Sequence, residues 1–144
     1  MSKTSVAIVL SFFSSMAFAQ MNPEGLWRNI DDKTGEAKAE IRIAATASGL
    51  LNGKIEKALT QGSEPNCSAC TDDRKDKPIL GMTIVRNMKQ DAADAAIWTG
   101  GDITDQKNGK VYRARLKPVD GGKTLEVRGY IGPFYRNQTW IRVE

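Results

Sequence analysis

The most distinctive chemical feature of the sequence is a pair of cysteines, Cys67 and Cys70, spaced as Cys-Ser-Ala-Cys. In redox enzymes this spacing lowers the pKa of the first thiol, and the motif usually begins a helix that follows a strand. The polar residues on either side show no such pattern, and a zinc site needs more ligands than these two cysteines. We therefore expect a structural disulfide, with a catalytic redox pair and a metal-bound or free thiol pair as the alternatives.

Histidine is absent from the chain, which limits the catalytic chemistry available to it. Its absence excludes Ser-His-Asp and Cys-His nucleophilic sites and histidine-ligated catalytic zinc. Three pairs of aspartates are candidates for the carboxylate chemistry of glycosidases: Asp31 and Asp32, Asp72 and Asp73, and Asp102 and Asp105. The first two pairs lie in turn-like stretches, where aspartate bonds its own backbone, so we interpret them as turn residues. We assign no catalytic residue, no metal ligand and no cofactor.

Residues 1–19 have the features of a cleavable signal peptide. Lys3 supplies the positive charge, residues 6–13 are apolar, and Ala17-Phe18-Ala19 offers the small residues that a signal peptidase reads. The apolar stretch is shorter than the roughly 20 residues that span a bilayer, so we expect no membrane anchor. We expect a periplasmic protein consisting of one domain, residues 20–144, in a compartment where a disulfide is the default state of two nearby cysteines.

The charge pattern argues against nucleic acid as a partner. The formal net charge is +4, and the basic residues are spread among nearly as many acidic ones. Proteins that bind nucleic acid usually gather their basic residues in a patch or a run. We therefore interpret the charges as an ordinary solvated surface.

The rest of the chain has the alternation of an all-β domain. In residues 39–45, for example, Ile41 and Ile43 alternate with Glu40 and Arg42. Short polar turns between consecutive strands favour an antiparallel up-and-down meander, and closing it into a small barrel removes its edges. Residues 60–78 form a long polar loop between two strands. We expect eight strands, over residues 25–30, 39–45, 50–59, 79–88, 95–103, 111–119, 123–131 and 138–143.

The first strand carries a short motif, Gly25-Leu26-Trp27, that resembles the Gly-x-Trp signature of lipocalins. In lipocalins an arginine from the last strand packs across this tryptophan, and Arg142 is the candidate here, since a guanidinium is attracted to an indole face. The alternative is that Trp27 is an ordinary buried tryptophan.

Several longer motifs together resemble an uncharacterised bacterial family, Domain of Unknown Function 2147 (DUF2147). They follow the family's order over nearly all of the expected mature chain. The resemblance implies an exported periplasmic protein, and it brings no reaction and no catalytic residues to carry over. The motifs cover residues 25–35, the two cysteines followed by 74–82, and residues 98–103, 108–112, 127–132 and 138–143.

Our leading hypothesis is a non-enzymatic, lipocalin-like barrel that binds one small apolar or amphipathic molecule. The residues expected to line the site are Trp27, Trp98, Tyr112, Tyr130 and Trp140, with Arg128, Arg136 or Arg142 meeting an acidic head group.

Two other classes of function remain open. One is a filled barrel that contacts a protein partner through residues 60–78 or through the loop of Phe134, Tyr135 and Arg136. The other is a thiol–disulfide enzyme that uses Cys67 and Cys70.

Overall fold

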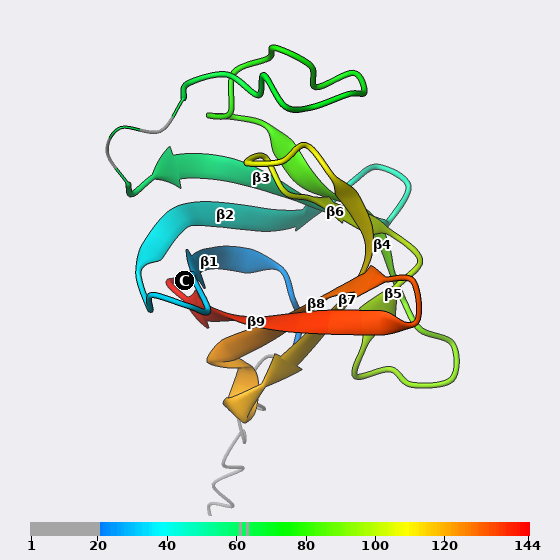
Figure 1. Cartoon of the computed structure of the whole chain (residues 1–144). Helices are drawn as coiled ribbons and strands as arrows, with labels where there is room; N and C mark the ends of the chain where they lie inside the picture. Colours follow the sequence, from blue (N-terminus) through cyan, green and yellow to red (C-terminus); the bar gives the residue numbers. More distant parts are fainter. Residues whose placement is uncertain (1–20, 61, 63) are drawn as a thin grey trace, which may run out of the picture.

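The computed structural model describes residues 21–144 apart from residues 61 and 63, and it shows an all-β protein (Figure 1). The expected signal peptide and Gln20 lie outside the described residues. The elements are β1 (Gly25–Ile30), β2 (Ala37–Ala45), β3 (Leu51–Ala58), β4 (Thr83–Gln90), β5 (Trp98–Thr99), β6 (Asp102–Thr104), β7 (Val111–Val119), the 3₁₀ helix η1 (Asp120–Gly122), β8 (Thr124–Ile131) and β9 (Phe134–Arg142).

The strands form one antiparallel sheet that closes on itself. β1 is bonded to both β2 and β9, and β3 is bonded to β4, so the sheet has no free edge at these strands. β5 and β6 both lie between β4 and β7 and together take the place of one strand. Counted in this way, the sheet is an eight-stranded antiparallel up-and-down barrel. The predicted fold class is confirmed.

The alternation seen in the sequence decides which side chains fill the barrel. In β2, Ala39, Ile41 and Ile43 are buried, whereas Glu40 and Arg42 remain partly exposed, because successive side chains of a strand point to opposite faces. The largest fully buried side chains of the core are Trp27, Trp140, Ile41, Ile43, Ile55, Met88, Leu116 and Leu125.

The end of the barrel near both chain termini, here called the closed end, is sealed by an arginine over a tryptophan. The guanidinium carbon of Arg142 lies 4.1 Å from the ring centroid of Trp27, within range of a cation–π contact. The indole N–H of Trp27 donates to the carbonyl of Pro23 at 2.7 Å. The predicted packing of Arg142 across Trp27 is confirmed. The guanidinium also donates to the backbone carbonyls of Asn22, Glu24 and Gly122, at 2.7, 2.8 and 2.6 Å.

The fourth strand begins later than the sequence predicts. We expected one strand over residues 79–88, but β4 starts at Thr83. Leu80 has the parity of the buried Met82 and Ile84, yet it is 62% exposed. The register with β3 shifts, and Asn87 has a φ of 61°, so the strand carries an irregularity that breaks simple alternation. Alternation fails at Leu80 because period two holds only within an unbroken strand.

The fifth predicted strand, residues 95–103, is split by two glycines. Gly100 has a φ of 80°, and a Cβ on Gly101 would lie 2.0 Å from the backbone oxygen of Arg86 in β4. Only glycine allows such a close approach of two backbones, so the pair bends the strand between β5 and β6.

Candidate functional site

The two ends of the barrel have different loops. Because neighbouring strands are antiparallel, the connections 46–50, 91–97 and 120–123 lie at the closed end with the termini. The connections 31–36, 59–82, 105–110 and 132–133 lie at the other end, here called the open end. Figure 1 shows the long green segment between β3 and β4 extending past the strands. Both cavities described below are at the open end.

The larger opening, here called the strand cavity, has a volume of about 350 Å³ and lies inside the mouth of the barrel. Its wall is formed by inward-facing side chains of β6, β7, β8 and β9, and its rim by the loops after β1 and β6. A volume of this size suits a small organic ligand. The apolar and aromatic lining residues are Ile103, Tyr112, Val127 and Ile131, and the polar ones include Asp31, Lys33, Lys38, Thr104, Asp105, Lys107, Arg136 and Gln138.

The lining of the strand cavity carries more positive than negative charge. Lys33, Lys38, Lys107 and Arg136 are set against Asp31 and Asp105, four cations and two carboxylates, which leaves a net charge of +2. Both carboxylates are engaged by the backbone. Asp31 accepts the N–H groups of Lys33 and Thr34, each at 2.9 Å, and Asp105 accepts that of Lys107 at 2.9 Å. Two of the four cations are paired with carboxylates outside the lining, since Lys38 lies 3.0 Å from Glu36 and Arg136 binds Asp32. The positive charge offered to an anionic group therefore comes chiefly from Lys33 and Lys107.

The cation that extends from β9, Arg136, is held in place by an ion pair. Its Nε donates to Asp32 at 2.7 Å, and its Nη2 donates to the other oxygen of the same carboxylate. The hydrogen bond from Arg136 lowers the pKa of Asp32 below its ordinary value of 3.8, and the same bond raises the pKa of Arg136. This pair joins the β1–β2 loop to β9 across the rim.

One polar group in the wall of the strand cavity lacks a partner. Thr104 is 2% exposed, and its hydroxyl has no hydrogen-bond partner among the described residues. A buried hydroxyl without a partner costs about 1–3 kcal/mol, so native proteins rarely keep one without a reason. The hydroxyl oxygen is itself buried, so a ligand in the cavity would reach it only after the side chain moves.

A second cavity, here called the loop cavity, lies under the connection between β3 and β4. It has a volume of about 340 Å³ and shares Lys38, Gln106 and Lys107 with the strand cavity. Its apolar surface comes from Ala39 and Ile55 on the strands and from residues of the long connection. The two cavities are therefore neighbours, separated by the tip of the β6–β7 loop.

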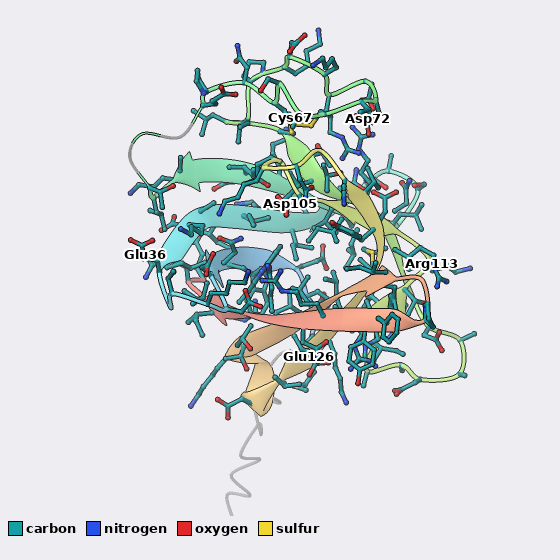
Figure 2. The ribbon with its side chains drawn as sticks, viewed as in Figure 1. Glu36, Cys67, Asp72, Asp105, Arg113 and Glu126 are labelled. Atoms are coloured by element: carbon teal, nitrogen blue, oxygen red, sulfur yellow. A yellow bond between two sulfur atoms is a disulfide. The ribbon has the colours of Figure 1, made fainter. Side chains whose placement is uncertain are left out.

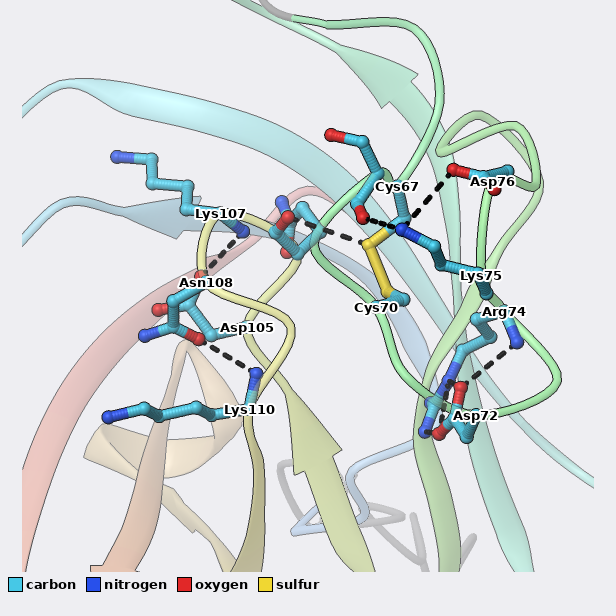
Figure 3. The surroundings of a disulfide bond; sticks show 12 residues. Cys67, Cys70, Asp72, Arg74, Lys75, Asp76, Asp105, Lys107, Asn108 and Lys110 are labelled. Carbon is cyan, nitrogen blue, oxygen red and sulfur yellow. Dashed lines mark hydrogen bonds and ion pairs between the residues drawn. A yellow bond between two sulfur atoms is a disulfide. The ribbon is translucent and has the colours of Figure 1, made fainter.

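The disulfide holds the long connection against the β6–β7 loop. Cys67 and Cys70 are bonded with an S–S distance of 2.03 Å, and both side chains are buried, which agrees with the expected structural disulfide. Figure 3 shows this bond beside the β6–β7 loop, and the Sγ atom of Cys67 lies 3.5 Å from the carbonyl oxygen of Gln106. Because a disulfide sulfur carries no proton, this is a packing contact between the loops and not a hydrogen bond.

A glycine permits this contact between the two loops. A Cβ on Gly109 would lie 1.8 Å from the carbonyl oxygen of Ala69, a distance that no side chain tolerates. Gly109 also has a φ of 71°, in the left-handed region that favours glycine. The short motif Asn108-Gly109 therefore both turns the chain and lets the disulfide segment approach.

The same connection is fastened to β4 by a hydrogen bond from Arg74 and by an ion pair between Asp73 and Arg86. The guanidinium of Arg74, whose residue is only 4% exposed, contacts both oxygens of Asp72 and donates to the carbonyl of Thr83 at 3.0 Å. Arg86 holds both oxygens of Asp73 at 3.0 and 2.9 Å. These hydrogen bonds lower the pKa of Asp72 and of Asp73 well below the ordinary value. Figures 2 and 3 show Asp72 on this connection, near the disulfide.

The first two aspartate pairs have structural partners, and in the third pair Asp105 accepts a backbone N–H whereas one oxygen of Asp102 is buried without a partner among the described residues. Asp31 and Asp72 accept backbone N–H groups of their own turns, which confirms the prediction of turn residues. Asp32 and Asp73 pair with Arg136 and Arg86. In the described part of the chain, no group of three or more Cys, Asp or Glu side chains is placed to hold a metal ion.

The residues proposed from the sequence to bind a ligand are distributed over four places. Tyr112 and Arg136 line the strand cavity, as proposed. Trp27, Trp98 and Trp140 are buried in the core and contribute to the lining of neither cavity. Arg142 seals the closed end. Tyr130 and Arg128 face outward, where the Arg128 guanidinium lies 3.9 Å from the ring centroid of Tyr135.

Some lining residues could have been found from the sequence and others could not. Gln138 has the same parity as the buried Trp140 and faces Val127 on the neighbouring strand, so alternation was a sufficient signal. Thr104 ends a strand, where alternation no longer applies, and Lys107 belongs to a loop whose position depends on Gly109. Pattern alone gives no signal for these two.

Among residues 21–60, 62 and 64–144, we find no helix with the length and apolar character required to cross a bilayer. A search of curated proteins gives no significant match to this sequence.

Comparison with solved structures finds a protein of similar fold. The structure is similar to that of protein HP1028 from the human pathogen Helicobacter pylori, which belongs to the lipocalin family, with a TM-score of 0.71. The match covers 87% of this chain and 85% of that chain at 12% sequence identity, so it shows a lipocalin-like fold and no more. The sequence profile of DUF2147, described as an uncharacterized protein conserved in bacteria, matches residues 25–142, and the chain therefore belongs to this family.

Proposed function

We propose that this protein is exported to the periplasm and binds one small amphipathic molecule with an anionic head group in the strand cavity. Export is supported by the charged, apolar and small residues of the segment 1–19, arranged as in a cleavable signal peptide. The observation that carries the binding proposal is the cavity of about 350 Å³ with apolar side chains on its strand wall and cations near its rim.

The distribution of apolar and charged side chains determines how the ligand is oriented in the strand cavity. Ile103, Tyr112 and Val127 on the strands offer the apolar part of the wall, against which a short hydrocarbon chain would be removed from water. The cations Lys33, Lys107 and Arg136 lie on or near the rim loops, where the head group would remain partly hydrated. The core beneath is filled by the buried tryptophans, so the ligand stays near the mouth.

A second candidate function is that of an interaction module. The side chains of Phe134 and Tyr135 are 74% and 56% exposed, which is unusual for aromatic residues and typical of contact surfaces. A thiol–disulfide enzyme is less well supported, because Cys67 and Cys70 are 0% and 1% exposed and an attacking thiolate would have to reach a buried sulfur.

Native mass spectrometry of protein purified from its own periplasm, followed by calorimetric titration, tests the binding proposal. We expect decanoate to bind saturably with a dissociation constant in the micromolar range, roughly −8 kcal/mol, and decyltrimethylammonium to bind much more weakly. Arg136→Gln should weaken decanoate binding, whereas Lys123→Gln, an exposed cation at the closed end, should not. Flat titrations with both probes and no retained molecule would refute the proposal.

A further inference from the structure

We propose that the β8–β9 hairpin docks on the surface of an anionic lipid bilayer. The contact is made by the hairpin tip, defined as Ile131, Gly132, Pro133 and Phe134, with the arginines and tyrosines behind it. This inference does not require a ligand in the strand cavity. It assigns the exposed aromatic surface to a lipid bilayer as its partner.

The hairpin tip exposes large apolar side chains together. Ile131 is 56% exposed and Phe134 is 74% exposed, and the two are direct register partners across the turn. Val111, at the start of the neighbouring strand β7, is 45% exposed. Single exposed apolar residues are ordinary, but a cluster on a projecting turn marks a surface that is covered by something else.

Tyrosines follow directly behind the tip. Tyr130 and Tyr135 are register partners one residue further from the turn, and their ring centroids lie 6.3 Å apart. Tyrosine has an apolar ring and a polar hydroxyl, and it is enriched at the level of the lipid head groups. The pair therefore has the chemistry of an interfacial belt.

Arginines extend from the same outer face. The guanidinium of Arg113 lies 5.5 Å from the ring centroid of Tyr130, and that of Arg128 lies 3.9 Å from that of Tyr135. Arg113 takes part in none of the ion pairs found among the described residues. Two acids lie on this face. Glu126 is paired with Arg115 at 2.5 Å and lies 3.6 Å from Arg128. Asp102 is the register partner of Arg113 on β6, and the three arginines outnumber these two acids. Figure 2 shows Arg113 near the β8–β9 turn and Glu126 farther along the sheet.

The order of these groups favours a bilayer over a protein partner. Along the hairpin, the apolar residues of the tip come first, then the tyrosines with Arg113 level with them, then Arg128. A protein that lies on a membrane likewise places apolar groups in the hydrocarbon, and aromatic and basic groups at the level of the phosphates. A protein interface would instead place its aromatic residues at the centre of a flat patch with a polar rim. The tip is a convex turn, and Gly132 has the φ of 55° that the turn requires.

Sedimentation with lipid vesicles tests the proposal with the full-length mature protein. We expect binding to phosphatidylethanolamine vesicles that contain about one-third phosphatidylglycerol, weakened by salt, and little binding to phosphatidylcholine alone. Phe134→Ser should reduce the partition constant about tenfold through lost apolar contact. Arg113→Gln should reduce it about fivefold on the anionic vesicles.

Matched variants at the closed end serve as controls. Ile141 is also an exposed apolar residue, at 41%, so Ile141→Ser should leave vesicle binding unchanged, and Lys123→Gln should do the same. Equal losses for Ile141→Ser and Phe134→Ser would overturn the proposal, as would absence of binding to the anionic vesicles. Binding to soluble polyphosphate that depends on Arg113, without vesicle binding, would assign the surface to a soluble acidic partner and would also overturn it.

Discussion

The closed and open ends of this barrel are built from the same strands, yet they are stabilised in different ways. At the closed end, Trp27 and Trp140 are fully buried, and Arg142 covers Trp27 while donating to three backbone carbonyls. At the open end, a disulfide closes a short turn within the β3–β4 connection, and two arginine–aspartate pairs join loops to β4 and β9. Dense core packing with a buried arginine therefore holds one end, whereas loop contacts around two cavities hold the other.

Buried polar groups at the two ends differ in whether they have hydrogen-bond partners. The guanidinium of Arg142 finds carbonyl partners, so its burial is compensated, although desolvation lowers its pKa from the usual arginine value. The hydroxyl of Thr104 finds none among the described residues. The buried guanidinium of Arg142 therefore stabilises the fold, whereas the buried hydroxyl of Thr104 costs stability.

The largest expected effect is on packing at the closed half of the barrel. Trp140→Ala should lower the free energy of unfolding by about 3–5 kcal/mol, because the fully buried indole leaves a cavity in the core. Tyr112→Ala, which removes a half-buried ring from the open end, should cost clearly less. Denaturant titrations of both variants measure this difference, and equal losses would mean that the open end is packed as tightly as the core.

The disulfide should have an intermediate effect that is confined to the open end. Replacing both Cys67 and Cys70 by Ser should lower the free energy of unfolding by about 2 kcal/mol, since the bond closes a very short loop. Amide exchange should become faster in residues 64–82 and 105–110 and remain unchanged near Trp27. Complete loss of folding would show that the disulfide segment supports the whole barrel.

Removing a single hydroxyl should have opposite effects at two threonines. Thr104→Val should raise the free energy of unfolding by about 1 kcal/mol, because it removes a buried group without a partner among the described residues. Thr99→Val should lower the free energy of unfolding by about 1 kcal/mol, since this hydroxyl donates to Asp91 at 3.2 Å. Thermal unfolding compares the two, and destabilisation by Thr104→Val would show that its hydroxyl has a structural role.

Acid should loosen the open end first, and this is the smallest of the expected effects. Bonds from Arg136, Arg74 and Arg86 hold the pKa values of Asp32, Asp72 and Asp73 below 3.8. Carboxyls whose pKa is lower in the folded state stabilise it fully above their unfolded pKa, and the contribution is lost as the pH falls through the folded value. Amide exchange below about pH 4 should therefore rise in the open-end loops before it rises around Arg142, whose carbonyl partners do not titrate in this range.

The sequence predicts the closed end far better than the open end. Strict alternation in β2 and β8 and the Gly-x-Trp motif were enough to predict the barrel and the contact between Trp27 and Arg142. The alternation of apolar and polar residues did not predict that Leu80 is exposed. It also did not predict that Trp98 and Trp140 are buried away from the cavities. Both features depend on three-dimensional packing, which decides where a strand becomes irregular and how much side-chain volume fills the barrel.

The position of the open-end loops depends on contacts between segments far apart in the sequence. Arg136 meets Asp32, and the disulfide segment meets the β6–β7 loop at Gly109. Local periodicity gives no information on such pairings. Arg136 was proposed from the sequence, but the lysines of the strand cavity became evident only from the structure.

An amide chemical-shift titration of ¹⁵N-labelled protein with decanoate is the most direct test of the claim that the open end binds a ligand. The account predicts saturable shifts at Thr104, Tyr112 and Gln138, reduced in Arg136→Gln, with no change around Trp27. Shifts centred on Trp27, or no saturable shift anywhere in the barrel, would contradict it.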